Sequence, residues 1–283
     1  MSCTLRSPLI DSHLLPNSQY DYVFCVGMRR GGSTLQTQLV SAILGRPTVH
    51  LVTPDTIAAF LQDHRDPKST IVAKSHKFLP QAAELSHTGR ARIVYVYRDL
   101  RDVVASIVKK YDSPPFSFVH GGLTALMKEY DAWTSVPGIH ISSYEALTRD
   151  IAGEAINLAD FLGIKLTESD AEMLADEFSV DRQRQSMRTT TADQGEGNNQ
   201  FNSETLLHRD HIQSGSSGSF RDTLAPSIVA ALEWQMRDWM KRNQYAPVHN
   251  VASQFLCNSM YSLKAMAHNI VRAKKTSNSV AEQ

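Results

Sequence analysis

The chain has 283 residues, of which 42% are hydrophobic, so it is long enough to bury one sizeable core. Its 29 basic and 29 acidic residues give a net charge of zero, which argues against a nucleic-acid partner and against a polybasic membrane-binding surface. Any positively charged site must therefore be a local cluster. Three widely spaced cysteines argue against a disulfide framework or a zinc cluster, and no stretch approaches the roughly 18 apolar residues that span a bilayer, so we expect a cytoplasmic protein without membrane insertion.

In the first half of the chain, short apolar runs alternate with segments whose apolar residues recur at helical spacing. A strand is expected at Tyr20 to Gly27, and a glycine-rich turn then leads into a helix at Ser33 to Leu44. Further strands are expected at Ser69 to Lys74, Ala91 to Tyr97 and Gly138 to Ser142, with a helix after each of the last two. This alternation predicts an α/β fold, with a central parallel sheet flanked by helices on both faces.

The second half contains a polar stretch between helical segments. No apolar periodicity survives from about Phe178 to Phe220, which predicts a long loop, interpreted as a lid near the substrate. Helices are expected at Pro226 to Arg242 and, with amphipathic spacing, at Val251 to Val271. We therefore divide the chain into an N-terminal extension (1–19), one domain (20–247) that includes the polar lid region 179–220, and a C-terminal helix and tail (248–283).

A glycine-rich loop lies between the first strand and the first helix. It reads Gly27-Met28-Arg29-Arg30-Gly31-Gly32-Ser33-Thr34, and backbone N–H groups and the helix dipole converge on an anion at such a point. The spacing approaches the P-loop GxxxxGK[ST], but the lysine that phosphoryl transfer requires is absent. The segment therefore predicts an anion site and weakens the prediction of a kinase.

The same loop resembles the 5′-phosphosulfate-binding loop of sulfotransferases that use 3′-phosphoadenosine-5′-phosphosulfate (PAPS), written PKSGTTW or PRSGTT. The resemblance implies that Arg29, Arg30, Gly31, Gly32, Ser33 and Thr34 bind the donor, with Arg30 at the position of the family's loop lysine or arginine. Arginine replaces the family's proline, and Leu35 replaces the tryptophan that stacks on adenine in many members.

The second predicted strand ends in Lys74-Ser75-His76, which is similar to the family's K-[ST]-H segment. The resemblance implies that His76 is the general base and that Lys74 contacts the reacting sulfonate. The chemistry favours this pair, because histidine can accept a hydroxyl proton near neutral pH and a fixed cation stabilises charge on the leaving oxygen.

The third predicted strand continues into Arg98-Asp99-Leu100-Arg101-Asp102, with Ser106 eight residues after Arg98. This spacing resembles the family's 3′-phosphate-binding segment, which implies that Arg98 and Ser106 hold the 3′-phosphate. Asp99 can cap the following helix and Asp102 lies in its first turn. Taken alone, Arg98 could equally form an ion pair with either aspartate.

Two later segments resemble further motifs of the family, and they occur in the same order along the chain. Ser143-Tyr144-Glu145 resembles the family's YEDL turn, which implies that Tyr144 lies near the adenine, although a half-buried tyrosine at a strand end is nearly as good an interpretation. Ser214 to Arg221 resembles the RKGxxGDW segment that closes over the 3′-phosphate, which implies that Ser214 and Gly215 contact the donor. Gln213 and Ser214 replace the expected basic pair, so Arg209 or Arg221 would have to supply the missing charge.

The sequence as a whole is thus identified as similar to PAPS-dependent sulfotransferases over roughly Tyr22 to Phe220. We expect a P-loop-like three-layer sandwich in a single domain, and an enzyme that moves sulfonate from PAPS to a hydroxyl or amine of a small molecule such as a secondary metabolite. The resemblance implies no metal requirement. The alternatives are a P-loop nucleotide kinase and a nucleotide-binding module without activity.

Overall fold

The computed structural model describes residues 20–65, 67, 69–189, 206 and 216–264. The chain forms two compact units, each built from two stretches: unit 1 from Met1–Arg98 and Glu129–Gly215, and unit 2 from Asp99–Lys128 and Ser216–Gln283. The predicted extension 1–19 and most of the predicted lid lie outside the described residues, so the predicted domain boundaries stay predictions.

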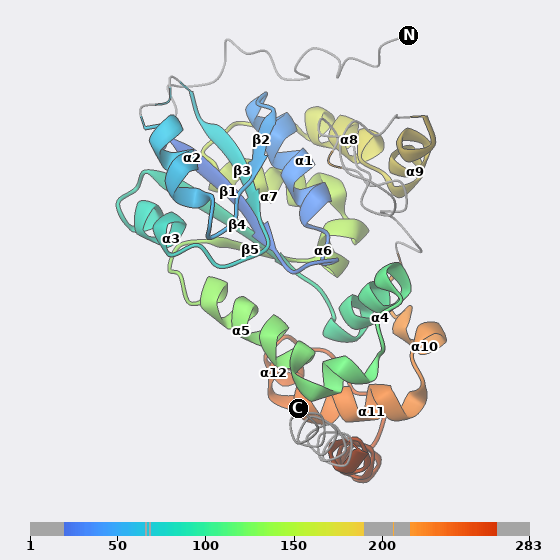
Figure 1. The fold of residues 1–283 in the computed structure, drawn as a ribbon. Coiled ribbons are helices and arrows are strands. Elements are labelled where there is room, and N and C mark those ends of the chain that lie inside the picture. The colour runs from blue at the N-terminus through green and yellow to red at the C-terminus, as the bar shows by residue number, and fades with distance from the viewer. Residues whose placement is uncertain (1–19, 66, 68, 190–205, 207–215, 265–283) are drawn as a thin grey trace. The chain divides into compact units, whose positions relative to one another are not determined.

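Unit 1 is built on a five-stranded, fully parallel sheet with the order β2-β3-β1-β4-β5 (Figure 1). The strands are β1 Tyr22–Gly27, β2 Thr48–Leu51, β3 Ile71–Ser75, β4 Ala91–Tyr97 and β5 His140–Ser143. Because β3 and β4 flank β1, the C-terminal ends of these three strands meet at one edge of the sheet. Open α/β sheets bind ligands at this edge, where the strand order reverses.

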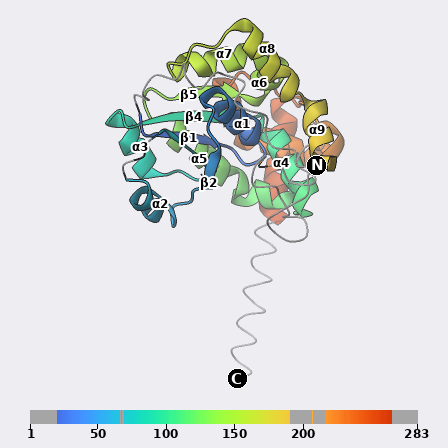
Figure 2. The ribbon, with the colours of Figure 1, turned by 90° about the horizontal axis from the view of Figure 1, so that it is seen from above.

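Helices cover both faces of this sheet, and α1 and α7 lie on the opposite side from α2 and α3 (Figure 2). The helices of unit 1 are α1 Ser33–Leu44, α2 Ile57–Asp63, α3 Pro80–His87, α6 Tyr144–Arg149, α7 Ile151–Phe161, α8 Glu168–Glu177 and α9 Val180–Thr189, and α5 Leu123–Thr134 contributes residues to both units. The prediction of an α/β fold with a central parallel sheet is confirmed.

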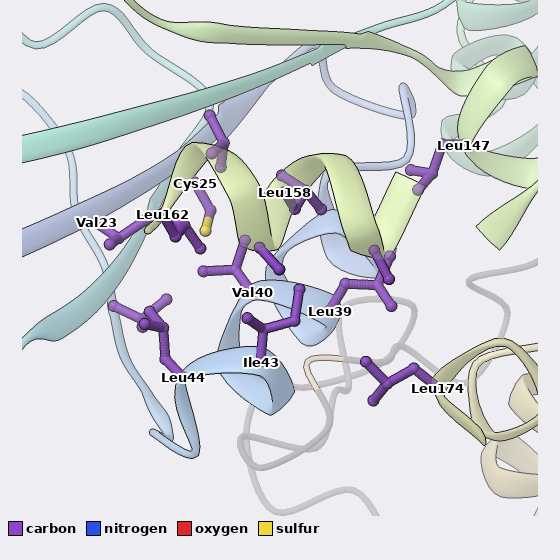
Figure 3. Packing of buried hydrophobic residues seen from close by; sticks show 14 of the residues in the cluster. Val23, Cys25, Leu39, Val40, Ile43, Leu44, Leu147, Leu158, Leu162 and Leu174 are labelled. Carbon is purple, nitrogen blue, oxygen red and sulfur yellow. The ribbon is translucent and has the colours of Figure 1, made fainter. Parts of the chain in front are cut away.

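The main core of unit 1 lies between the sheet, α1 and α7 (Figure 3). The apolar spacing of α1 places Leu39, Val40 and Ile43 on its buried face. The side chains they meet include Val23, Cys25, Val94, Leu147, Leu158, Leu162 and Leu174. Each fully buried side chain of this size contributes roughly 1.5–3 kcal/mol, so this packing fixes α1, and with it the preceding loop, against the sheet.

Unit 2 is helical in its described part. Its helices are α4 Leu100–Tyr111, η2 Phe118–Gly122, α10 Phe220–Thr223, α11 Pro226–Gln235, α12 Arg237–Arg242 and a last helix at 251–264. A buried ion pair supports α4, because Arg101 contacts Asp99 at 2.7 Å and Glu233 of α11 at 2.6 Å. Burial lowers the pKa of Arg101, but the hydrogen bonds and charges of these two carboxylates more than offset it, so the net shift is upward.

Several elements differ from the expectation, and helices α2, α3, α5 and α8 were not predicted. Edge strand β2 was not predicted from the sequence. The expected loop from Phe178 onward is wrong for Val180–Thr189, which forms α9. This helix is held by a polar contact that apolar periodicity cannot signal, from Gln183 Nε2 to Gln38 Oε1 of α1 at 2.9 Å. The single helix expected to Arg242 is two, because Met236 leaves helical geometry (φ −108, ψ 16).

Candidate functional site

The glycine-rich loop connects β1 to α1, so the N-terminus of α1 lies at the C-terminal edge of the sheet. Helix α1 begins at Ser33 after Gly32, with no side-chain cap and no acidic residue in its first turn. The N–H groups of a first helical turn have no acceptor within the helix. Ser33 and Thr34 are buried, so an anion is a fitting partner for these groups and for the positive end of the helix dipole.

Position 32 requires glycine for two reasons, its backbone conformation and the close approach of Tyr144. Its φ of 94° is left-handed, and a Cβ atom at this position would lie 2.6 Å from Cδ2 of Tyr144. The Tyr144 ring therefore packs directly on the loop. On the same ring lies the guanidinium of Arg98, whose Cζ is 4.2 Å from the ring centroid.

Arg98 links the end of β4 to the loop as well. It is 7% exposed, and its NH1 donates a long hydrogen bond of 3.5 Å to the carbonyl oxygen of Arg30. Arg30 itself adopts a left-handed φ of 63°, which costs a non-glycine residue roughly 1–2 kcal/mol. Such strain is typical of functional sites. Arg29 is exposed beside it.

Lys74 is a buried ammonium group at the C-terminal end of β3. It lies on β3 beside Cys25 of β1, is 7% exposed, and donates from Nζ to Thr34 Oγ1 at 2.7 Å. Burial lowers the pKa of Lys74 to about 8, whereas burial raises the pKa of Cys25 to about 12, so Cys25 is a neutral thiol near pH 7. Among the residues that the structure describes, no carboxylate lies within 4.0 Å of Lys74 Nζ.

His76 is held in a defined orientation just after β3. Its Nδ1 lies 3.0 Å from the carbonyl oxygen of Gly27. A carbonyl oxygen can only accept, so Nδ1 carries the proton, and in the neutral ring Nε2 then carries the lone pair. The histidine is partly buried at the edge where the loop, β3 and β4 end. This tautomer suits a general base that acts through Nε2.

Glu129 on α5 fixes the two residues that follow His76. Its Oε2 accepts from the backbone N–H of Phe78 at 2.7 Å, and its Oε1 accepts from Lys77 Nζ at 3.0 Å. The Phe78 ring also packs edge-on against Trp133 at 4.9 Å between centroids. These contacts make the segment after β3 a positioned turn. The sequence offered no pattern from which this role of Glu129 could be predicted.

In unit 2 the start of α4 is organised by two aspartates. Asp99 caps the helix and accepts from Arg101 N at 2.9 Å, as predicted. Asp102 is fully buried and accepts from Gly218 N at 2.7 Å, Ser219 Oγ at 3.0 Å and Phe220 N at 3.0 Å. The segment that resembles the family's RKGxxGDW motif is thereby anchored to α4. The sequence placed Asp102 in the first turn but gave no sign of this partner.

The structure brings most of the predicted site residues of unit 1 together. Direct contacts join Lys74 to Thr34, His76 to Gly27, Arg98 to Arg30, and Tyr144 to both Gly32 and Arg98. Ser106 lies partly buried on α4 in unit 2, and its joint role with Arg98 stays a prediction. Ser214 and Gly215 lie outside the described residues.

Within the residues that the structure describes, no group of three or more His, Cys, Asp or Glu side chains could hold a metal ion. No helix there is long and apolar enough to cross a membrane.

Comparison with known proteins gives one family match, which covers part of the chain, and several solved structures with a similar fold. Residues 118–244 match the family model for the sulfotransferase domain, a stretch that includes Tyr144 and begins after the loop, His76 and Arg98. No curated protein matched the sequence. The fold is similar to that of retinol dehydratase in complex with androsterone and the inactive cofactor PAP (18% identity, 84% of each chain, TM-score 0.53).

A second solved structure gives the same result. A mouse sulfotransferase, SULT7A1, complexed with PAP is similar at 15% identity over 87% of this chain and 92% of its own, with a TM-score of 0.59. At these identities the structures establish the shared fold. The domain match over residues 118–244 and the shared fold agree with the family predicted from the sequence.

Proposed function

We propose that the chain is an enzyme that transfers a sulfonate group from PAPS to a hydroxyl or amine of a small molecule. One observation carries this proposal above the others. Lys74 places a buried cation, with a neutral hydroxyl as its hydrogen-bond partner, beside an uncapped helix start. A buried charge is costly unless an anion compensates it, so a phosphosulfate is a fitting ligand at this point.

The donor is bound along the edge of the sheet. Arg29 to Thr34 hold the 5′-phosphosulfate through backbone N–H groups, two hydroxyls and the charge of Arg30. Arg98 binds the 3′-phosphate, with Ser106 as its predicted partner. Tyr144 orients the Arg98 guanidinium by stacking and borders the adenine side of the site.

The chemistry is a single displacement at sulfur. His76 Nε2 takes the proton of the acceptor hydroxyl or amine while a new bond forms between that oxygen or nitrogen and sulfur. The bond between sulfur and the bridging phosphate oxygen breaks, and the electron pair stays on the 5′-phosphate of adenosine 3′,5′-bisphosphate (PAP). Lys74 and Arg30 stabilise the charge that builds on this oxygen.

The acceptor is a small molecule. Retinol dehydratase, which shares the fold, was crystallised with retinol and with androsterone. Both are hydroxyl-bearing compounds, and they agree with the acceptor class proposed for this chain.

A thermal-shift titration tests the proposal against nucleotide kinases. A ligand that binds only the folded state at about 100 times its dissociation constant adds about 2.7 kcal/mol, which raises Tm by about 5 °C or more in a protein of this size. We expect this shift with PAP, unchanged by EDTA, and little shift with ATP and magnesium. A larger, EDTA-sensitive shift with ATP would contradict the proposal.

A further inference from the structure

The last described helix, residues 251–264, packs on unit 2 with polar side chains. Gln254 Nε2 donates to Glu233 Oε2 at 3.3 Å, and Gln235 Nε2 of α11 donates to Asn258 Oδ1 at 2.9 Å. The Tyr261 hydroxyl lies 2.9 Å from Ser227 Oγ at the start of α11. The Phe255 ring also packs edge-on against Trp234 of α11, at 5.2 Å between ring centroids, so hydrogen bonds and one aromatic contact attach the helix to its unit.

Apolar side chains of the same helix are nevertheless exposed. Val251 is 69% exposed, Phe255 51%, Leu256 65%, Met260 37% and Leu263 67%. Leu256, Met260 and Leu263 follow one another at spacings of four and three, so they form one stripe. We call Leu256, Met260 and Leu263 the apolar face. This arrangement reverses the usual one, in which an amphipathic helix turns its apolar side to the core.

An exposed apolar stripe of this kind marks an interaction surface, and the local charge indicates its partner. Residues 239–281 contain six lysines and arginines and no aspartate or glutamate, although the whole chain has a net charge of zero. Lys264 follows the apolar face directly, and Arg272, Lys274 and Lys275 come soon after in the sequence. Apolar and basic residues in this combination are typical of helices that lie on anionic lipid surfaces.

A second copy of the chain is a poorer partner for the same face. In a two-fold dimer the same patch meets itself, so the basic residues of one copy would face those of the other. Anionic lipid instead neutralises them. We propose that the apolar face of the 251–264 helix docks this protein on anionic membrane surfaces.

Vesicle co-sedimentation of the full chain tests this docking, with phosphatidylcholine and phosphatidylglycerol vesicles against phosphatidylcholine alone. We expect binding to the mixed vesicles that weakens as salt is raised, and at least about tenfold weaker partition for the double variant Leu256→Ser, Leu263→Ser. Lys264→Gln should weaken it less. Met173→Ser, which alters a 43% exposed side chain on α8, is the matched control and should bind as the wild type does.

The result that would overturn the proposal is equal partition of the double variant and the control, or no preference for anionic lipid. A dimer in light scattering that the double variant dissociates, without vesicle binding, would assign the face to self-association instead. Both leucines are exposed, so the variants should keep the wild-type Tm. Because vesicle binding is measured without substrate, its outcome is independent of the proposed sulfonate transfer.

Discussion

Lys74 and Thr34 are joined by a buried hydrogen bond of 2.7 Å from Nζ to Oγ1, although forty residues separate them. The bond ties the end of β3 to the first turn of α1. It places a buried ammonium beside the first turn of α1, whose N–H groups would receive an anion. The predicted sulfonate-binding lysine and the predicted phosphosulfate-binding loop are thus in direct contact.

The lowered pKa of Lys74 predicts a particular dependence of stability on pH. Below about pH 8 the amine is charged in both states, and its burial opposes folding. Between pH 8 and the ordinary lysine pKa of 10.5 the folded state has lost the proton and the unfolded state has kept it, so the free energy of unfolding rises with pH. The gain amounts to about 3 kcal/mol.

Urea denaturation of wild type and Lys74→Met across this range measures that gain. The difference between the two proteins should grow in favour of the wild type as pH rises from 8. PAP binding should also take up a proton at about pH 8.5, because an anion restores the charged form. Calorimetry in buffers of different ionisation enthalpy detects the uptake, and a wild type indistinguishable from Lys74→Met in both experiments would refute this role.

His76→Ala should lose roughly 10²- to 10⁴-fold in turnover while PAP affinity stays near the wild-type value. The reason is that a general base acts in the transition state and contributes little to donor binding. Single-turnover transfer of radiolabelled sulfonate and calorimetric titration with PAP measure the two quantities. His87→Ala, an exposed histidine on α3, is the control. Transfer that survives within a few-fold would assign the proton to another group.

Glu129→Ala should lower turnover by about tenfold without changing PAP affinity, because Glu129 positions the turn after His76. Glu129→Gln keeps an acceptor for Phe78 N and should recover most of the loss. A merely structural role would lower Tm in both variants and leave turnover per folded molecule unchanged. The matched control is Glu84→Ala, which removes an exposed carboxylate from α3.

Asp102→Asn should lower the free energy of unfolding by about 1–3 kcal/mol, because an amide group would face three donors that a carboxylate now satisfies. Urea denaturation measures the change. Asp222→Asn makes the same substitution at an exposed position on α10 and should have little effect. Equal effects of the two substitutions would mean that the anchoring of Gly218 to Phe220 contributes no stability.

Much of the fold of unit 1 follows from local sequence signals. Helix α1 and strand β4 have the predicted bounds, because apolar spacing and a left-handed cap at Gly45 are local features. Edge strand β2 and helix α9 are among the elements that were missed. The first is only four residues long, and the second is held by the contact between Gln183 and Gln38 on α1, which cannot be read from periodicity.

The same limit applies to the candidate site. Residues at strand ends, such as Lys74, His76 and Arg98, could be predicted because each follows an apolar run and matches a family segment. Glu129 and Asp102 act through partners 51 and 116 residues away in the sequence. Only the tertiary fold brings such pairs together, and a single sequence holds no local signal for them.

The central claim is that the edge of the sheet recognises PAP, and calorimetric titration with PAP and with adenosine 5′-phosphate tests it most directly. The two ligands differ only in the 3′-phosphate that Arg98 would bind by charge-assisted hydrogen bonds. We predict that the wild type binds PAP at least about tenfold more tightly than adenosine 5′-phosphate, and that Arg98→Ala removes most of this difference. Equal affinity of the wild type for both nucleotides, or an equal loss for both in Arg98→Ala, would contradict the account.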